Sequence, residues 1–297
     1  MDRDTFIIVV YCLVVEHYQA LTAHRPLRHG GFLPTLSDEE VITMEICGEY
    51  FKLTSDKDIW QYFRTHYRHF FPALGDRTLF GRQAAHLWQV KAAIQQRLTP
   101  VSGQAQAPIQ PMDTLPLPVC VYTRSRRDRC LKPYADYGYC AAKDLYYYGF
   151  KLGLRISRIG MITHYPLLAA RPHDINHLEA LVEDGRGLVP ADKGFIDAHK
   201  QALLAERHAI MVVTPPRARM QPAHPRVLLK ACGRWRKLIE TVGSHLTERF
   251  AVERIRVHDL WHYQHRLIRK VLAHTVAVFL NLQMGRPPLD LDGLVTA

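Results

Sequence analysis

The chain has 297 residues, of which 47% are hydrophobic and 23% are charged, and its formal net charge is +11. This composition excludes an intrinsically disordered chain and allows one large or two modest globular domains. The charge excess lies entirely after residue 100, because residues 1–100 contain 11 basic and 11 acidic side chains and residues 101–297 contain 28 and 17. We therefore expect the later part of the chain to have a polyanionic partner.

The cysteines and the N-terminal apolar run indicate the compartment. None of the six cysteines forms a Cys-x-x-Cys pair, which disfavours a disulfide scaffold and a zinc finger and favours reduced thiols. The apolar run from Phe6 to Val15 is too short for a membrane span, and Asp2 and Asp4 precede it where a signal peptide would be basic. We expect a buried helix there, a cytoplasmic protein and no membrane partner.

Residues 1–100 have the patterns of a helical domain. Ser37 and Glu40 form a capping box ahead of an apolar stretch, Ser55 or Asp56 can cap a second helix, and Asp76 precedes a third helix that extends through Ile94. Arginines interleaved with tyrosines could contact a DNA backbone, and a face of solvated arginines explains them about equally well.

The segment from Thr99 to Pro111 has the composition of a linker, and strands follow it. Short β-rich or apolar runs cover 119–123, 146–156, 161–168, 188–191 and 210–214, with a helical stretch at 196–208. The order of strands and helices predicts a mixed α/β domain over residues 108–290.

The last part of the sequence is predicted to be helical, over 234–250 and over about 259–282. His258, His262 and His265 recur there at spacings that could ligate a metal, but a packed or solvated histidine face is the commoner use of such a pattern.

Three acidic residues far apart in the chain carry the chemical hypothesis. Asp113 opens the mixed domain, Asp192 follows an apolar run and shortly precedes a glycine, and Glu240 lies on a predicted helix one turn after Arg236. Carboxylates gathered from distant segments are the ligands that Mg²⁺ uses at phosphodiester-cleaving sites. Each residue alone also has an ordinary interpretation, as a turn aspartate or as a surface glutamate paired with a neighbouring cation.

The residues around these acids resemble the DDE transposases of bacterial insertion sequences, particularly the nine-eight-two group. The resemblance rests on Met112-Asp113-Thr114-Leu115-Pro116, on Ala191-Asp192-Lys193-Gly194-Phe195 and on Arg236-Lys237-Leu238-Ile239-Glu240-Thr241-Val242, followed by Phe250 and Glu253. The tail segment Ile268-Arg269-Lys270-Val271-Leu272-Ala273-His274 adds to it, and the similar region covers about residues 33–290.

The resemblance implies a ribonuclease H-like catalytic domain, an α/β fold in which helices flank a mixed sheet. It further implies that Asp113, Asp192 and Glu240 bind two Mg²⁺ ions, with Mn²⁺ as a possible substitute. Arg236 matches the arginine four residues before the glutamate in a related transposase signature. Gly233 and Thr247 depart from that signature, which has tyrosine and lysine there, so the roles of those two positions do not carry over.

Basic residues near the predicted site suggest how DNA is held. No acidic residue interrupts the stretch between Pro216 and Ile239, and a merely solvated basic face is the alternative to phosphate binding. The predicted DNA-binding residues are Lys193, Arg217, Arg219, Arg226, Lys230, Arg234, Arg236 and Lys237. The resemblance implies double-stranded DNA partners, namely element ends and target, with the helical domain at 1–100 as a possible binder of the ends. It also implies a homodimer or larger assembly on DNA, and association with the bacterial nucleoid.

Two other functions remain compatible with the sequence. One is a nuclease that cuts DNA without joining it. The other is a repressor derived from a transposase, which binds the element ends without catalysis.

Overall fold

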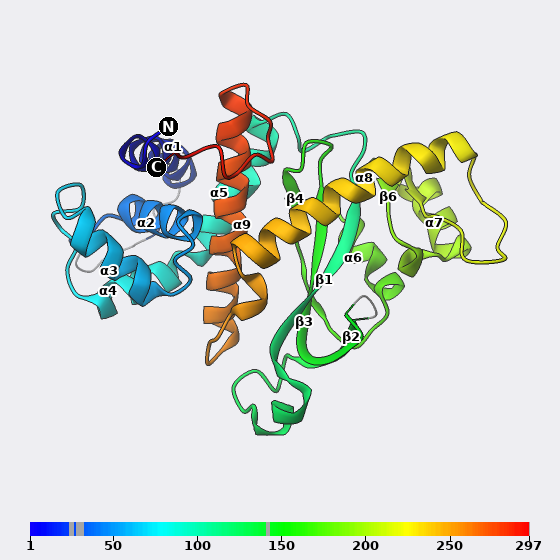
Figure 1. Ribbon diagram of the computed structural model, residues 1–297, viewed down its shortest axis with the longest axis horizontal. Coiled ribbons are helices and arrows are strands. Elements are labelled where there is room, and N and C mark those ends of the chain that lie inside the picture. The colour runs from blue at the N-terminus through cyan, green and yellow to red at the C-terminus, as the bar shows by residue number, and fades with distance from the viewer. Residues whose placement is uncertain (24–26, 28–32, 141–142, 297) are drawn as a thin grey trace. The chain divides into compact units, whose positions relative to one another are not determined.

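The computed structural model describes residues 1–23, 27, 33–140 and 143–296. Figure 1 shows its elements in chain order. The chain forms two compact units, which are considered separately below. Unit 1 contains Met1–Leu98 and Leu246–Ala297, and unit 2 contains Thr99–His245.

Unit 1 is built from helices around two buried ones, α2 and α9 (Figure 1). Eleven of the thirteen residues of α2 and seventeen of the twenty-four residues of α9 are buried, because the other helices pack around both. The elements are α1 (Arg3–Thr22), α2 (Asp38–Tyr50), α3 (Asp56–His66), α4 (Arg77–His86), α5 (Trp88–Val101, unit 1 through Leu98), η5 (Val252–Arg254) and α9 (Leu260–Gln283).

The helix starts predicted in this unit are confirmed. The Ser37 hydroxyl accepts a hydrogen bond from the Glu40 backbone at 3.1 Å, and the Glu40 carboxylate accepts one from the Ser37 backbone at 2.7 Å. Ser55 caps α3 and Asp76 caps α4. The single helix predicted after Asp76 is wrong, because the structure breaks at Leu87 into α4 and α5.

Helix α1 is 20 residues long, twice the predicted apolar run, and its length and mean hydropathy of 1.5 would suffice for a membrane span. It nevertheless contacts α2, and Phe6, Val10 and Val14 on one of its faces are fully buried. We interpret α1 as a packed helix of unit 1.

Unit 2 contains a long central strand, β3 (Leu145–Ile156), that pairs antiparallel with four others (Figure 1). These are β1 (Met112–Val121), β2 (Asp136–Cys140), β4 (Ile162–His164) and β5 (Leu167–Ala169). A parallel pair, β6 (Gly187–Pro190) and β7 (Ile210–Val213), forms a second small sheet. A parallel bridge between Ile109 and Leu188 connects the segment before β1 to β6.

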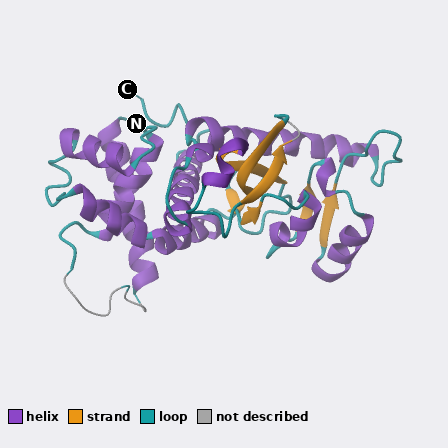
Figure 2. Ribbon diagram, turned by 90° about the horizontal axis from the view of Figure 1, so that it is seen from below, coloured by secondary structure: helices purple, strands orange, loops and turns teal. Residues whose placement is uncertain are grey.

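Helices cover the strands of unit 2. Helix α8 (Arg226–Ser244) packs on β1, β3 and β6 through its buried residues, which include Ile239 and Val242, and Figure 2 shows it running along the strands. A π-helical turn (His245–Arg249) follows α8, and unit 2 ends at His245. The other helical segments are η1 (Tyr122–Arg127), η2 (Asp174–His177), α6 (Leu178–Val182), η3 (Lys193–Phe195) and α7 (Ala198–His208).

Unit 2 therefore has the predicted mixed α/β character, with a mostly antiparallel sheet, but two predicted boundaries are wrong. Strand β1 begins at Met112 rather than Val119, although it contains Pro116 and Pro118. The prolines are tolerated because β3 is the strand that pairs with β1 here, which leaves one edge of β1 without a ladder to interrupt. Helix α8 begins at Arg226 rather than Arg234.

The compact units and the predicted domains divide the chain differently. The break between Leu98 and Thr99 lies close to the predicted end of the first domain at residue 100, but residues 246–290 belong to unit 1. The functional division into an end-binding domain at 1–100 and a catalytic domain at 108–290 remains a prediction.

Candidate active site

The parallel register of unit 2 brings the first two predicted acids together. Asp113 lies four residues after Ile109 and Asp192 lies four residues after Leu188, and Ile109 and Leu188 pair in the parallel bridge. The Gln110 backbone N–H also donates to the Leu188 carbonyl at 2.9 Å, and the Leu188 N–H donates to the Pro108 carbonyl at 2.9 Å. Two parallel strands rise by the same distance per residue, so the two aspartates lie at the same end of the strands.

Glu240 lies at the same end of the strands, where Arg236 is close to both Glu240 and Asp192. One guanidinium nitrogen of Arg236, Nη2, lies 3.1 Å from Oδ1 of Asp192 and 3.9 Å from Oε1 of Glu240. Arg236 and Glu240 are one turn apart on α8, whose buried face packs on the strands, so the packing of the helix places both side chains beside Asp192. The side chains of Asp192 and Glu240 are 48% and 61% exposed, which leaves both accessible to a phosphate.

Asp113 is the least solvated member of the group. Burial raises its pKa to about 7, and the negative charges of Asp192 and Asp174 contribute to the rise. The Thr114 backbone N–H, which donates to Oδ1 of Asp113 at 2.7 Å, and the charge of Arg236 act in the opposite direction. A carboxyl with this pKa is part protonated at neutral pH, and a bound cation would favour its charged form.

Asp174 is a fourth acid at this end of the strands, and the sequence did not identify it as a site residue. It is the first residue of η2, and His173 occupies the N-cap position. Its Oδ1 accepts hydrogen bonds from Lys151 Nζ at 2.8 Å and from the Thr114 hydroxyl at 3.0 Å. Thr114 follows Asp113 directly, so these contacts tie the Asp113 strand to β3 and η2. Nothing in the local sequence around Asp174 indicates this position.

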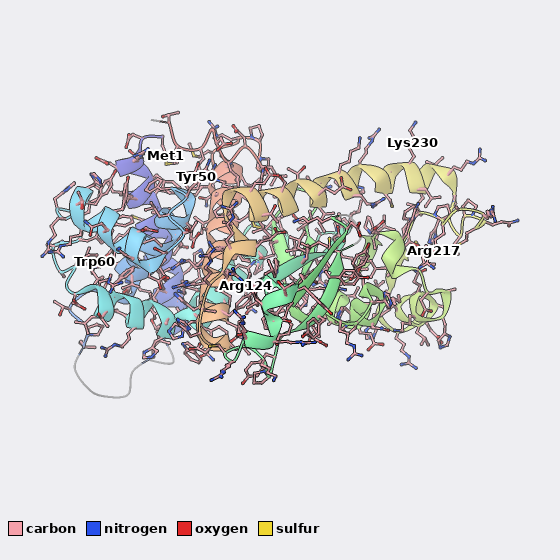
Figure 3. The ribbon with its side chains drawn as sticks, turned by 60° about the horizontal axis from the view of Figure 1, so that its bottom comes forward. Met1, Tyr50, Trp60, Arg124, Arg217 and Lys230 are labelled. Atoms are coloured by element: carbon pink, nitrogen blue, oxygen red, sulfur yellow. The ribbon has the colours of Figure 1, made fainter. Side chains whose placement is uncertain are left out.

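The predicted DNA-binding residues lie beside Asp192, in the loop before α8 and along α8 itself. All but the half-buried Arg236 are exposed. Arg226, Lys230 and Arg234 recur every four residues on one face of α8, and Figure 3 shows Lys230 projecting from the helix. Arg217 donates to the Lys193 carbonyl at 3.4 Å, which ties the loop before α8 to the residue after Asp192.

A family model described as a transposase DDE domain matches residues 103–260 of the chain. The match covers 158 of the 297 residues, which is more than half of the chain, and it contains all three predicted acids. The chain belongs to the transposase DDE domain family. Membership implies a phosphoryl-transfer enzyme that acts on DNA and, for the family in general, the use of divalent metal ions. No curated protein and no solved structure matches the chain.

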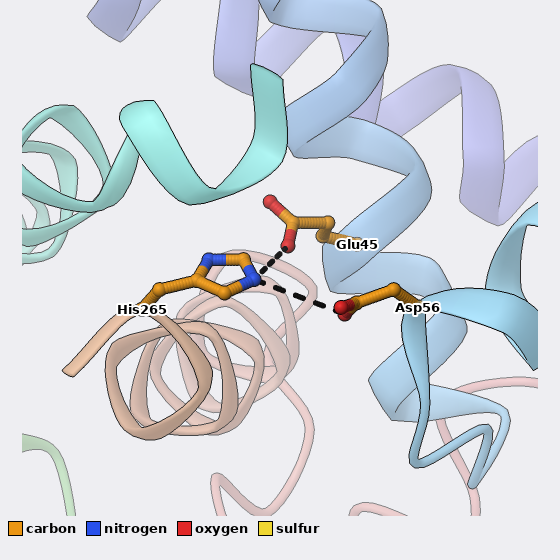
Figure 4. Close-up of side chains that lie close together, drawn as sticks. All are labelled: Glu45, Asp56 and His265. Atoms are coloured by element: carbon orange, nitrogen blue, oxygen red, sulfur yellow. Dashed lines mark ion pairs between the residues drawn. The ribbon is translucent and has the colours of Figure 1, made fainter. Parts of the chain in front are cut away.

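A second group of possible metal ligands in this transposase lies in unit 1. The candidate ligand atoms of Glu45, Asp56 and His265 lie within 4.8 Å of one another, and Figure 4 shows His265 facing both acids. Among the residues that the structure describes, the predicted triad does not meet that spacing.

Cations already neutralise the group in unit 1. Lys91 Nζ lies 2.5 Å from Glu45, and Arg269 contacts both Glu45 and Asp56. Lys91 Nζ also lies 2.9 Å from Nδ1 of His265, and burial, with the Lys91 charge, keeps the pKa of His265 well below its usual value. A divalent cation would add charge to a balanced, buried network, so we interpret the group as a structural ion network.

A cavity of about 730 Å³ in unit 2 lies apart from the acids. Its lining includes residues of α6 and α7 and Ile210 at the start of β7, whereas Asp192 follows the other end of the parallel pair. The cavity therefore cannot supply groups to the carboxylates.

Proposed function

We propose that the chain is an insertion-sequence transposase, of the nine-eight-two group, that cuts phosphodiester bonds at the ends of its element and joins the freed 3′ ends to target DNA. The observation that carries the proposal is the convergence of Asp113, Asp192 and Glu240 around Arg236 in unit 2, inside the family match.

The strand order supports a ribonuclease H-like fold for unit 2. The pairings lead from β4 and β5 through β3 and β1, and by the Ile109–Leu188 bridge to β6 and then β7. The five antiparallel strands, β1 to β5, come first in the chain and the two parallel strands follow. One catalytic acid lies on the first strand, one follows the first parallel strand, and the third lies on the helix that covers both.

The donor set suits divalent metal ions. Asp113, Asp192 and Glu240 offer only carboxylate oxygens, which Mg²⁺ and Mn²⁺ prefer. Burial is the main cause of the raised pKa of Asp113, and the nearby charges of Asp192 and Asp174 add to it, so a cation bound here would lower that pKa. Arg236 already places a positive charge near Asp192 and Glu240. Two such ions, when bound, would activate the attacking oxygen and stabilise the leaving oxygen.

The residues of the chain itself bind and orient the DNA. Lys193, Arg236 and Lys237 lie next to the acids and are positioned to contact the phosphates that flank the scissile bond. Arg226, Lys230 and Arg234 extend the basic surface along α8, away from Glu240. Water is the first nucleophile and the freed 3′ hydroxyl the second, so one site serves both steps without a covalent protein intermediate. We place the enzyme in the cytoplasm on the nucleoid, acting as a homodimer or larger assembly on duplex DNA.

The test is incubation of the full chain, with Mg²⁺ or Mn²⁺, on DNA that carries the repeats flanking its locus. Asp192→Asn should abolish cleavage and leave DNA binding in EDTA unchanged, because the fold and the basic residues remain. Asp197→Asn is the matched control, since Asp197 caps α7 and asparagine caps equally well. Cleavage by Asp192→Asn at the wild-type rate would end the proposal.

Pre-cut DNA ends separate the alternatives. Joining of pre-cut ends to a target plasmid is expected of a transposase. A chain that cuts the ends but never joins them is a nuclease, and one that only binds them is a repressor.

A further inference from the structure

One end of the unit 2 sheet carries tyrosines on a face turned to water. Tyr122, Tyr137, Tyr139 and Tyr146, called here the tyrosine face, are 52%, 42%, 47% and 63% exposed. The strand pairing explains why Tyr137, Tyr139 and Tyr146 share a face, because Tyr139 lies opposite Tyr146 and Tyr137 lies opposite the buried Tyr148. Tyr122, the first residue of η1, packs beside Tyr137 and Tyr146. The solvated face of an antiparallel sheet ordinarily carries polar side chains, so four exposed rings call for a partner.

The rings form a continuous surface. The centroids of Tyr139 and Tyr146 are 4.7 Å apart, those of Tyr122 and Tyr137 are 5.2 Å apart, and those of Tyr122 and Tyr146 are 6.2 Å apart. The opposite side of the sheet is packed, since Tyr147 is buried and fills the space that a Cβ on Gly138 would need. The packed side fixes which rings face the solvent.

A basic loop borders the tyrosine face. Arg124, Arg126, Arg127, Arg129 and Lys132, called here the basic loop, are all exposed, and none forms an ion pair with any residue that the structure describes. The Ser125 hydroxyl holds the loop against the tyrosines, through hydrogen bonds to the Tyr122 carbonyl at 2.7 Å and with the Tyr137 hydroxyl at 3.0 Å. Figure 3 labels Arg124 in this loop.

The two acids of this segment do not neutralise the loop. Asp128 accepts hydrogen bonds from the backbone N–H groups of Cys130 and Leu131, and Asp136 accepts one from that of Tyr137. Five cations against two acids leave a net charge of +3 on residues 122–139. This charge suits a polyanion and opposes a second copy of the same surface.

We propose that the tyrosine face and the basic loop bind unpaired DNA, with bases stacked on the rings and phosphates held by the arginines. Aromatic rings beside cations bind single strands in this way, and base pairing in an intact duplex would keep the bases from the rings. The inference rests on the proposed function, because a transposase generates unpaired strands when it opens and cuts element ends.

The distance along β1 limits where on the DNA this contact falls. Asp113 and Val121 are eight residues apart on the strand, which corresponds to about 26 Å at about 3.3 Å per residue. Successive stacked nucleotides are about 3.4 Å apart, so the contact lies within about eight nucleotides of the phosphate at the acids. We expect it on the strand that flanks the cut.

The test compares ring removal with ring retention in the full chain, in EDTA, where cleavage cannot occur. Fluorescence anisotropy measures the binding of a labelled 20-nucleotide single strand and of the duplex of the same sequence. Tyr139→Ala with Tyr146→Ala should weaken single-strand binding about tenfold or more and duplex binding less than twofold. Tyr139→Phe with Tyr146→Phe keeps both rings and should bind both DNAs as the wild type does.

The salt dependence of single-strand binding tests the basic loop separately. The slope of log affinity against log salt is negative, and Arg126→Gln with Arg127→Gln should reduce its magnitude for the single strand by about 1.4, because each phosphate contact contributes about 0.7. An unchanged slope would show that these two arginines do not contact the phosphates of the single strand.

Four other outcomes would overturn the inference. Three are binding results for the alanine pair: wild-type affinity for the single strand, an equal loss of affinity for both DNAs, or the same affinities as the phenylalanine pair. The fourth is a light-scattering result in which the alanine pair separates a dimer while DNA binding is unchanged, which would make the face a contact between two copies. Asp192→Asn distinguishes this inference from the proposed function, since it should lose cleavage and retain single-strand binding.

Discussion

Asp113 and Asp192 occupy equivalent positions on two parallel segments, because each stands four residues beyond one partner of the Ile109–Leu188 bridge. The equivalence is a property of the backbone register, so it does not depend on the rotamer of either side chain. A one-residue slip between the segments would turn one carboxylate to the opposite face of the sheet. The site therefore depends on the core that holds this register, in which Met112 and Val189 are buried.

The pH dependence of stability follows from Asp113. Its pKa is raised to about 7 in the folded chain, so between about pH 4 and pH 7 the folded state holds a proton that the unfolded state has released. More protons bound to the folded state means that stability falls as pH rises through this window. Asp113→Asn removes the titration and should stabilise the metal-free protein at pH 8 by about 1–2 kcal/mol, since solvent screens a half-buried group.

Urea unfolding in EDTA at pH 5 and pH 8 measures this effect. The wild type should lose stability between the two values relative to Asp113→Asn, and Asp197→Asn should follow the wild type. Equal pH dependence in the Asp113 variant and the wild type would show that Asp113 does not titrate in this range.

Arg236 competes with a cation for the same oxygens. It lies 3.1 Å from Asp192 and 3.9 Å from Glu240, so Arg236→Gln leaves the carboxylates more negative. We expect Mn²⁺ to bind the DNA-free variant several-fold more tightly by titration calorimetry, and cleavage at saturating metal to fall because a phosphate contact is lost. Arg234→Gln removes the same charge from an exposed position two residues earlier and should leave metal affinity nearly unchanged. Weaker metal binding by Arg236→Gln would contradict this competition.

The ion network of unit 1 should respond to mutation and not to chelators. Lys91 and Glu45 are fully buried, so Lys91→Met leaves a buried carboxylate without its nearest cation and should reduce the free energy of unfolding by about 3–5 kcal/mol. Adding Glu45→Gln should recover part of that loss. EDTA should leave the thermal midpoint of the wild type unchanged, and a midpoint that rises with added Zn²⁺ would show instead that Glu45, Asp56 and His265 hold a metal.

Local signals predicted the parts of the fold that local chemistry determines. The capping box at Ser37 and Glu40 is present because its two hydrogen bonds form within four residues. The start of β1 was misplaced because prolines at 116 and 118 normally argue against a strand, and only the tertiary arrangement shows that one edge of this strand needs no donors.

The residues of the candidate site also fall into two groups, those with a local sequence motif and those without one. Resemblance identified Asp113, Asp192 and Glu240, since the flanking residues form recognisable motifs. It did not identify Asp174 or Lys151, whose pairing joins positions 23 residues apart and leaves no local pattern. The tyrosine face was also missed, because Tyr122 and Tyr146 become neighbours only when β1 and β3 pair.

The basic face of α8 offers a test of DNA binding that is independent of catalysis. If Arg226, Lys230 and Arg234 each neutralise one phosphate of duplex DNA, changing all three to glutamine should reduce the magnitude of the negative slope of log affinity against log salt by about 2.7, because each contact contributes about 0.9. The loss should be similar for all sequences, since phosphate contacts carry no base information. Glutamine at the exposed Lys52, Lys57 and Arg207 removes the same total charge elsewhere. An equal change of slope in that control would mean that net charge, and not the face of α8, attracts the DNA.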